Sequence, residues 1–250
     1  MTARDWDAST YERVSDPQVE MAVRVLDRLP LRGDETVLDA GCGTGRVTRL
    51  LLDRVPRGRV IAVDAAPSMV EAAREALGER ATVIQSDLTE LTLEEPADAA
   101  FSNAVFHWVL DHQRLFERLH AALRPGAPLV AQCGGKGNID RFRALADEVA
   151  AEPPFAEHFD GWVGPWNYAT PEETAERLAA AGFDGVRTWL EDWPVVPPEP
   201  RDYFRTVCLG CHVERLPPEL RDAYVDAVAE RAGPRPELHY VRLNILARRA

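Results

Sequence analysis

A glycine-rich turn constrains the fold of this chain more than any other feature of its sequence. Residues 37–45 read VLDAGCGTG, in which an apolar run ends at Asp39 and three glycines then alternate with small residues. The following segment, RVTRLLLDRV, has the apolar spacing of a helix. Because glycine has no Cβ, the backbone can turn tightly and a ligand can approach it closely. The pattern predicts a strand, a ligand-binding turn and a helix, in that order.

A second acidic residue narrows the class of ligand. The apolar run at 59–64 ends in Asp64, about 20 residues after the glycines, where nucleoside-binding sheets place a carboxylate on the ribose hydroxyls. A dinucleotide-binding turn requires glycine at the position that Arg46 occupies here. Asp39, ahead of the turn, suits a cationic amino-acid tail better than a pyrophosphate, because opposite charges attract.

The pattern D-x-G-x-G-x-G with Asp64 downstream resembles motif I of the class I S-adenosylmethionine (SAM)-dependent methyltransferases. The resemblance implies that the chain binds SAM as its cofactor. It places the methionine moiety over Gly41 and Gly43, and the ribose on the carboxylate of Asp64.

The same resemblance implies further cofactor contacts at the next strand ends. Met69 is expected to lie against adenine, and Asp87 to accept from the adenine amino group. The backbone amide of Leu88 is expected to contact the adenine ring. Asn103 is expected to lie where the backbone passes the methionine end of SAM. The alternatives are an ordinary core methionine for Met69 and a helix N-cap for Asp87.

The segment 102–112, SNAVFHWVLDH, bears on the methyl acceptor, because His107 and Trp108 stand on a turn that leaves an expected strand. It resembles the corresponding segment of the trans-aconitate 2-methyltransferase family, of malonyl-carrier-protein methyltransferases and of juvenile hormone acid methyltransferases. Those enzymes esterify carboxylates. The resemblance to the first family includes the N-terminal DWDASTY, so Trp6 and Tyr11 are expected to fold over the cofactor and bind substrate.

A carboxylate acceptor needs different help from a phenol. A carboxylate, with a pKa of about 4, is ionised at neutral pH and needs only donors that orient it, such as the Trp108 indole and a His107 N–H. A phenol, with a pKa of about 10, needs a base, and His107 is the obvious candidate. His107 thus orients an acid in one hypothesis and removes a proton in the other; a purely structural role for both residues is the third alternative.

Aromatic residues gather at 161–168, GWVGPWNY, beside glycines. On a mobile insertion, Trp162, Trp166 and Tyr168 are expected to close a dry pocket, with Trp166 in contact with substrate; alternatively they form the insertion's own small core. Arginines are also expected near a carboxylate site. The sequence does not choose among four candidates, most of which are typical of solvated surface charge: Arg141, Arg143, Arg201 and Arg205.

The overall charge argues against a nucleic-acid partner. The chain has 29 basic and 41 acidic residues, a net charge of −12, and no basic tract. A small-molecule substrate in a locally cationic pocket remains compatible with this charge. The N-terminus lacks the apolar core of a signal peptide and no apolar run is long enough to span a bilayer, so we expect a cytoplasmic protein without membrane association.

The four cysteines are too sparse for a disulfide framework in 250 residues. Cys208, Cys211 and His212 match the C-x-x-C-H pattern of haem attachment and contain a C-x-x-C pair. Without an export signal, a second ligand pair or a preceding strand, we interpret this match as coincidence rather than a haem, zinc or redox site.

Strand and helix patterns alternate from residue 35 to residue 133, which predicts a parallel sheet covered on both faces. The rhythm breaks at 134–169 and again from 192 to 236; between these breaks, Thr170-Pro-Glu-Glu173 predicts a capped helix. The closing run ELHYVRLNILARR predicts a strand that needs no following helix.

We therefore expect one α/β domain over residues 1–250. It is a doubly wound, seven-stranded and mostly parallel sheet whose last strand is antiparallel, with lid segments at about 1–20, 134–169 and 192–235.

The leading functional hypothesis is a SAM-dependent methyltransferase that modifies a small molecule at a carboxylate oxygen. The alternative enzyme is a specialised-metabolite methyltransferase that acts on a hydroxyl, amine or carbon. A SAM-binding module without turnover is the third hypothesis. The presence of Asp39, Asp64 and Asp87 argues against lost binding but does not prove catalysis. The sequence does not indicate the oligomeric state or the particular acceptor.

Overall fold

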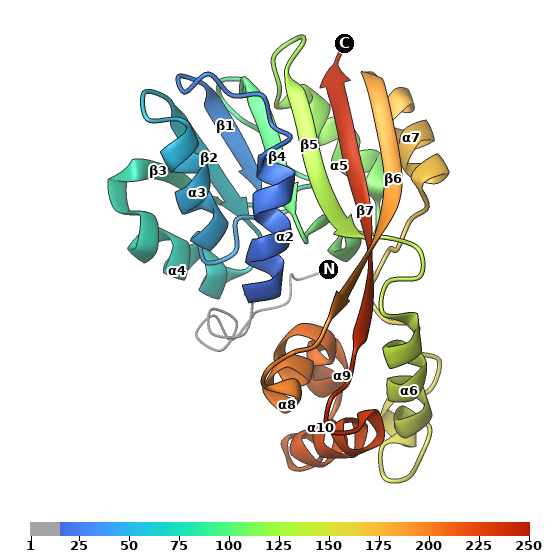
Figure 1. The fold of residues 1–250 in the computed structure, drawn as a ribbon. Helices are drawn as coiled ribbons and strands as arrows, with labels where there is room; N and C mark the ends of the chain where they lie inside the picture. The colour runs from blue at the N-terminus through green and yellow to red at the C-terminus, as the bar shows by residue number, and fades with distance from the viewer. Residues whose placement is uncertain (1–15) are drawn as a thin grey trace.

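The computed structural model describes residues 16–250 and contains the predicted seven-stranded sheet (Figure 1). The strands lie side by side in the order β3-β2-β1-β4-β5-β7-β6, and β7 is antiparallel to both of its neighbours. Their bounds are β1 Thr36–Ala40, β2 Arg59–Asp64, β3 Ala81–Gln85, β4 Ala99–Asn103, β5 Pro128–Gly134, β6 Phe183–Val195 and β7 Leu238–Arg249. The strand order reverses between β1 and β4, which is where doubly wound sheets bind ligands.

Helices cover both faces of the sheet. On one face lie α2 (Asp16–Leu26), α3 (Arg46–Arg54) and α4 (Pro67–Leu77); on the other lie α5 (His112–Ala121) and α7 (Pro171–Ala180). Successive strand residues point to opposite faces, so Val37 of β1 packs with the first group and Leu38 with the second. Both faces are buried, which explains why the parallel strands are almost uniformly apolar.

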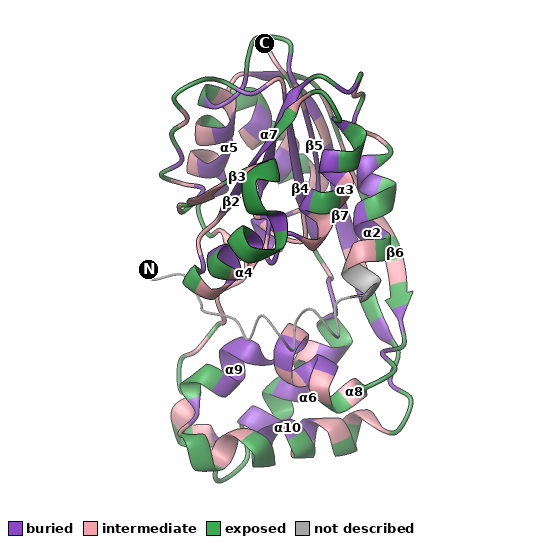
Figure 2. Cartoon of the chain, turned by 90° about the vertical axis from the view of Figure 1, so that its left-hand side faces the viewer, coloured by how far each residue is buried: buried purple, intermediate pink, exposed green. Residues whose placement is uncertain are grey.

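The two segments that break the strand–helix rhythm form a separate helical layer below the sheet (Figures 1 and 2). This layer has its own apolar core, in which Phe204, Tyr224 and Tyr240 are buried. Its elements are α6 (Asp140–Ala150), the 3-10 turn η3 (Ala156–His158), α8 (Pro200–Tyr203), the π-helical turn η4 (Phe204–Cys208), α9 (Gly210–Arg215) and α10 (Pro218–Ala232). None of the helices in residues 16–250 is long and apolar enough to cross a membrane.

A two-stranded ribbon connects the sheet to this layer, and here the structure corrects the predicted boundary. The sequence predicted that the strand–helix rhythm breaks from residue 192 onward, but β6 continues to Val195, and Pro194 pairs with His239 of β7. Proline is tolerated because β6 is the edge strand, where a missing N–H breaks no ladder on the outer side. Residues 238–241 of β7 pair only with β6, beyond the end of β5.

Candidate functional site

Gly41 and Gly43, in the turn after β1, are glycines for different structural reasons. Gly41 has φ +93°, and a Cβ there would lie 2.2 Å from Cγ2 of Val105, so this glycine allows the turn to pack on the segment after β4. Gly43 has φ +55°, and no atom of the described residues 16–250 lies within 4 Å of the position its Cβ would take. The space beside Gly43 is therefore left open by the fold.

Asp64, at the end of β2, holds this turn in place. One carboxylate oxygen accepts a hydrogen bond from the backbone N–H of Gly43 at 2.9 Å, and the other accepts from the N–H of Ala66 at 3.0 Å. Burial raises the pKa of Asp64, while the backbone hydrogen bonds act in the opposite direction. A carboxylate oxygen has two lone pairs, so each oxygen retains capacity for another donor.

Asp39 lies behind the turn and is only 2% exposed. The Thr48 hydroxyl, on α3, donates to it at 2.7 Å. Burial raises the pKa of Asp39 to about 7, and the nearby Asp64 carboxylate raises it further against the lowering effect of Thr48. A cation that binds near the buried carboxylate of Asp39 and the half-buried carboxylate of Asp64 reduces the repulsion between them.

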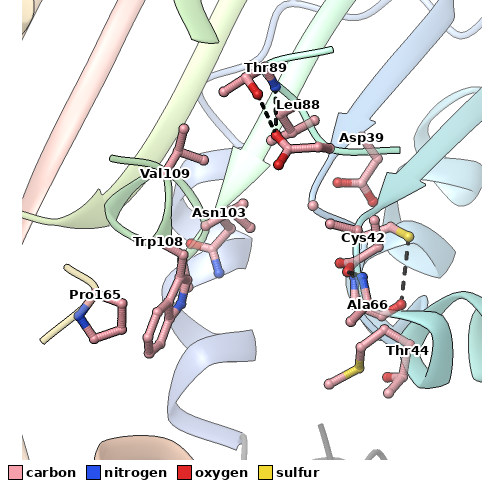
Figure 3. A pocket seen from close by; sticks show the side chains of 18 of the residues that line it. Asp39, Cys42, Thr44, Ala66, Leu88, Thr89, Asn103, Trp108, Val109 and Pro165 are labelled. Atoms are coloured by element: carbon pink, nitrogen blue, oxygen red, sulfur yellow. Dashed lines mark hydrogen bonds between the residues drawn. The ribbon is translucent and has the colours of Figure 1, made fainter. Parts of the chain in front are cut away.

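A cavity of about 830 Å³, called here the large cavity, opens at the carboxyl ends of β1, β2 and β4 (Figure 3). Its wall includes nine of the residues predicted from the sequence: Asp39, Gly41, Gly43, Asp64, Met69, Asp87, Leu88, Asn103 and Trp108. In Figure 3, Asn103 and Trp108 lie across the cavity from Asp39 and Cys42. Its volume lies within the ~300–1,000 Å³ typical of small-molecule sites.

The predicted adenine-contacting residues differ in exposure. Met69 and Leu88 are buried, whereas Asp87 is exposed on the loop after β3. One oxygen of Asp87 accepts from both the backbone N–H and the hydroxyl of Thr89, at 2.8 Å each (Figure 3). No helix follows this loop before β4, so Asp87 closes a turn rather than capping a helix.

His107 lies on the 3-10 turn η2 (Phe106–Trp108) after β4, and it does not line the large cavity. The turn is fixed from two sides: His112 donates through Nε2 to the Phe106 carbonyl at 2.9 Å, and the Asn167 N–H donates to the His107 carbonyl at 2.9 Å. Nδ1 of His107 accepts from the backbone N–H of Gly134 at 3.2 Å, which leaves the ring proton on Nε2. Burial, with help from Arg242 and His112, holds the His107 pKa well below its usual value.

His107 instead lines a second cavity of about 50 Å³, called here the small cavity. Trp166 lines it too, from the segment at 134–169, and stacks parallel to Tyr168 at a centroid distance of 6.4 Å. Ala104 and Trp108 border both cavities, so the two adjoin at this point. Ala104 has φ +61°, a conformation that costs about 1 kcal/mol or more in a non-glycine residue and is typical of functional sites.

Two predicted residues, Trp6 and Tyr11, lie outside the described residues. Of the four candidate arginines, only Arg143 lines a cavity, the small one. Arg201 and Arg205 form surface ion pairs with Asp222. Arg141 is exposed.

The C-x-x-C-H segment enters the helical layer. Cys208 and Cys211 are buried and are not joined in a disulfide, and His212 packs on Trp162 and Tyr224. Within residues 16–250 no group of three or more potential ligand side chains is arranged to hold a metal ion.

Sequence reasoning missed several residues at the cavities. Thr48, which donates to Asp39, could not be distinguished from any other residue of its helix by sequence. Glu214 and Arg215 line the large cavity although their positions in the chain are far from its other residues. Arg242, in the small cavity, carried a signal that could have been used: it is a charged residue inside the apolar run of the last strand.

Residues 37–126 match the model of a family described as a methyltransferase domain. The chain is 38% identical to a trans-aconitate 2-methyltransferase of Methylobacterium nodulans over 186 residues, covering 74% of this chain and 67% of the relative. It is 36% identical to one from Variovorax paradoxus over 224 residues, covering 88% and 86%. Its fold resembles the solved YcgJ protein of Bacillus subtilis, with a TM-score of 0.64 at 14% identity, covering 92% of this chain and 98% of the other.

Proposed function

The chain belongs to the trans-aconitate 2-methyltransferase family and is a SAM-dependent methyltransferase, and on this premise we propose that it methylates a carboxylate oxygen of a small organic acid. The single observation that carries the proposal is the state of His107. Its Nδ1 is engaged by the Gly134 N–H, so the ring offers an N–H donor and no free base. A donor suits an acid that is already ionised.

The large cavity fits SAM. The open space beside Gly43 receives a ligand without a clash, and the carboxylates of Asp39, Asp64, Asp87, Asp111 and Glu214 outnumber Arg46 and Arg215 on its wall. This balance favours a ligand that carries an ammonium and a sulfonium charge. When bound, SAM supplies an electrophilic methyl carbon, so that the acceptor oxygen gains the methyl group and the sulfur leaves as a neutral thioether.

The proposed cofactor contacts follow from the position of each residue. Asp64 binds the ribose hydroxyls with the lone pairs that its backbone donors leave, and Asp39 stabilises the cationic tail near Gly41 and Gly43. Asn103, at the end of β4, lies beside the methionine end. Met69 and Leu88 supply apolar surface and a backbone amide for adenine, beside Asp87.

The acceptor is oriented from the side where the two cavities adjoin. Trp108 borders both cavities, and His107, the residue before it, lines the small cavity and carries its proton on Nε2. Donors fixed in this way align a carboxylate for in-line attack. His107 is poorly suited to act as the base that a phenol requires. Its pKa is held well below neutral, and the lone pair of Nδ1 already accepts the hydrogen bond from the Gly134 N–H.

The helical layer is proposed to act as the lid of a single domain. Trp162 and Pro165 of the segment 134–169, and Cys211 of the segment 192–235, reach the wall of the large cavity. A lid of this kind excludes water from the reacting groups. The proposal also includes a cytoplasmic location, which the lack of disulfides in residues 16–250 supports. It further includes an acceptor other than nucleic acid, which the net charge of −12 supports.

The test is transfer from methyl-labelled SAM to a panel of polycarboxylic acids, fatty acids, phenols and amines. A base-labile methyl ester from a carboxylic acid is the expected product. A base-stable ether or methylamine as the main product contradicts carboxylate transfer. Binding of S-adenosylhomocysteine (SAH) without transfer to any acceptor of the panel points to a binding module.

A further inference from the structure

Arg242 is the most deeply buried arginine at either cavity. It lies on β7, opposite Gly134 of β5, and is 2% exposed. Its position deep in the sheet is unusual, because charged side chains are rarely fully buried unless they are paired. The guanidinium therefore needs an explanation from its partners.

Those partners leave Arg242 incompletely satisfied. Its Nε donates to Gln132 Oε1 at a long 3.4 Å, and its Nη2 is buried without any hydrogen-bond partner. Among residues 16–250 no carboxylate forms an ion pair with it. The titratable groups that interact electrostatically with it are the thiol of Cys133, the phenols of Tyr240, Tyr168 and Tyr203, and the imidazole of His107. A buried cation without an anion is strongly unfavourable, so Arg242 holds a charge whose natural partner is not among the described residues 16–250.

Arg242 faces the small cavity, and several other side chains with N–H or O–H donors line that cavity. Arg143 joins it, stacked on Trp166 and Tyr168 at 5.2 and 5.3 Å. Tyr240 and Tyr168 line it as well, and burial keeps both phenols protonated by raising the pKa of Tyr168 to about 12 and that of Tyr240 further. In the described part of the chain no carboxylate borders this cavity. The charged side chains on the wall of the small cavity are thus basic, whereas most of those on the wall of the large cavity are acidic.

The size and place of the small cavity match one anionic group. Its volume of about 50 Å³ holds a group the size of a carboxylate, since a single water needs ~10–15 Å³ measured in this way. It adjoins the large cavity at Ala104 and Trp108, and His107 lies on its wall. One molecule can therefore present one carboxylate at the border and another to Arg242.

We infer that Arg242, with Arg143 beside it, binds a second carboxylate of the acceptor, one that is not methylated. Arg242 is thereby the residue on which a preference for acids with two or more carboxylates over monocarboxylic acids depends. This inference rests on the proposed function, which by itself requires only one carboxylate. A guanidinium is planar and can bind a carboxylate through two N–H groups at once, and Nη2 of Arg242 has no partner among the described residues.

The experiment compares three acids with a similar unsaturated chain: trans-aconitate, trans-glutaconate and crotonate, which carry three, two and one carboxylates. The quantities are kcat/KM for ester formation and, independently of turnover, the calorimetric Kd of trans-aconitate for the SAH-bound protein. The variants are Arg242→Gln and Arg242→Lys. Arg201→Gln is the matched control, because Arg201 forms surface ion pairs away from both cavities.

The expected result is a kcat/KM ratio of trans-aconitate to crotonate of at least ~30-fold, which Arg242→Gln abolishes mainly through KM. The Kd of trans-aconitate rises by a similar factor, SAH affinity changes less than about twofold, and Arg242→Lys falls between. A ratio within about threefold in the unmodified protein overturns the inference, and so does an unchanged Kd in Arg242→Gln. The unmodified protein provides the first of these tests even if Arg242→Gln does not fold, and Arg143→Gln, at a more exposed position, then replaces it.

Failure of the inference differs from failure of the proposed function. Ester formation that does not depend on the number of carboxylates or on Arg242 leaves carboxylate transfer standing and removes the second anion site. Binding of trans-aconitate that depends on Arg242, with no ester from any acid, supports the anion site and contradicts carboxylate transfer.

Discussion

Replacing Asp39 by asparagine tests the electrostatics of the large cavity, because this carboxyl is buried with a pKa of about 7 against an ordinary value of 3.8. At pH 8 the group is ionised in both the folded and the unfolded chain. The difference in pKa then corresponds to about 4 kcal/mol of stability lost by holding the charge in the fold. Asparagine keeps the size of the side chain and removes the charge, so Asp39→Asn should be the more stable protein at pH 8.

The sign reverses the usual behaviour of acidic residues. The folded pKa is raised, so the folded chain takes up a proton as pH falls through about 7, while the unfolded chain remains ionised down to about 4. Wild-type stability relative to Asp39→Asn should thus increase by about 2–3 kcal/mol from pH 8 to pH 5. The buried histidines, whose lowered pKa values act in the opposite direction, are present in both proteins and cancel in the difference.

The assay is urea unfolding of the ligand-free proteins at pH 8 and pH 5, followed by far-UV circular dichroism. Asp53→Asn, at a side chain that is 71% exposed, is the control and should show no pH-dependent gap. A gap that is equal at the two pH values, or an Asp39→Asn protein that is less stable at pH 8, refutes the argument. SAH should bind Asp39→Asn more weakly than wild type at pH 8, because its ammonium loses a buried counter-charge.

Three further substitutions test the proposed contacts. Asp64→Ala should weaken SAH binding by about 1.5–3 kcal/mol for each lost charge-assisted hydrogen bond, measured by calorimetry; unchanged affinity contradicts the ribose contact. Gly43→Ala should melt within a few degrees of wild type and lose SAH affinity, because the added methyl group enters open cavity space. Gly41→Ala should melt at a much lower temperature, because its methyl group meets the side chain of Val105. Similar effects of the two substitutions refute this distinction. His107→Gln should retain ester formation within about tenfold, because glutamine still donates; a loss of ~10²-fold or more in kcat indicates a base instead.

The elements that could be predicted from the sequence depend on short-range interactions. The alternating strand and helix patterns, the capping box at Thr170 and Glu173 and the antiparallel last strand are all present in the structure. Backbone preferences and hydrophobic periodicity act over a few residues, so a single sequence reveals them. The break predicted from residue 192 began too early, because β6 continues through Pro194. A proline inside a strand is acceptable only at a sheet edge, and edge position is a property of the whole sheet.

The site divides in the same way. The sequence determined the glycine turn, Asp39 and Asp64, because all three follow from two adjacent strand ends and the spacing between them. It placed His107 and Trp108 together, but their side chains face different surroundings: Trp108 borders the large cavity, while His107 lies only on the small one, its Nδ1 bonded to Gly134.

The sequence by itself determined the cofactor-binding half of this protein, from the VLDAGCGTG turn and the acidic residue that follows on the next strand. Only the tertiary structure revealed the residues that we propose to bind the acceptor. Arg242, Arg143 and His107 are separated by 35 residues or more along the chain, and the paired strands and the helical layer bring them to one small cavity. Local sequence patterns encode a turn. The charge of a cavity assembled from distant segments depends instead on which side chains are buried there and which of them have ion-pair or hydrogen-bond partners, and packing sets both.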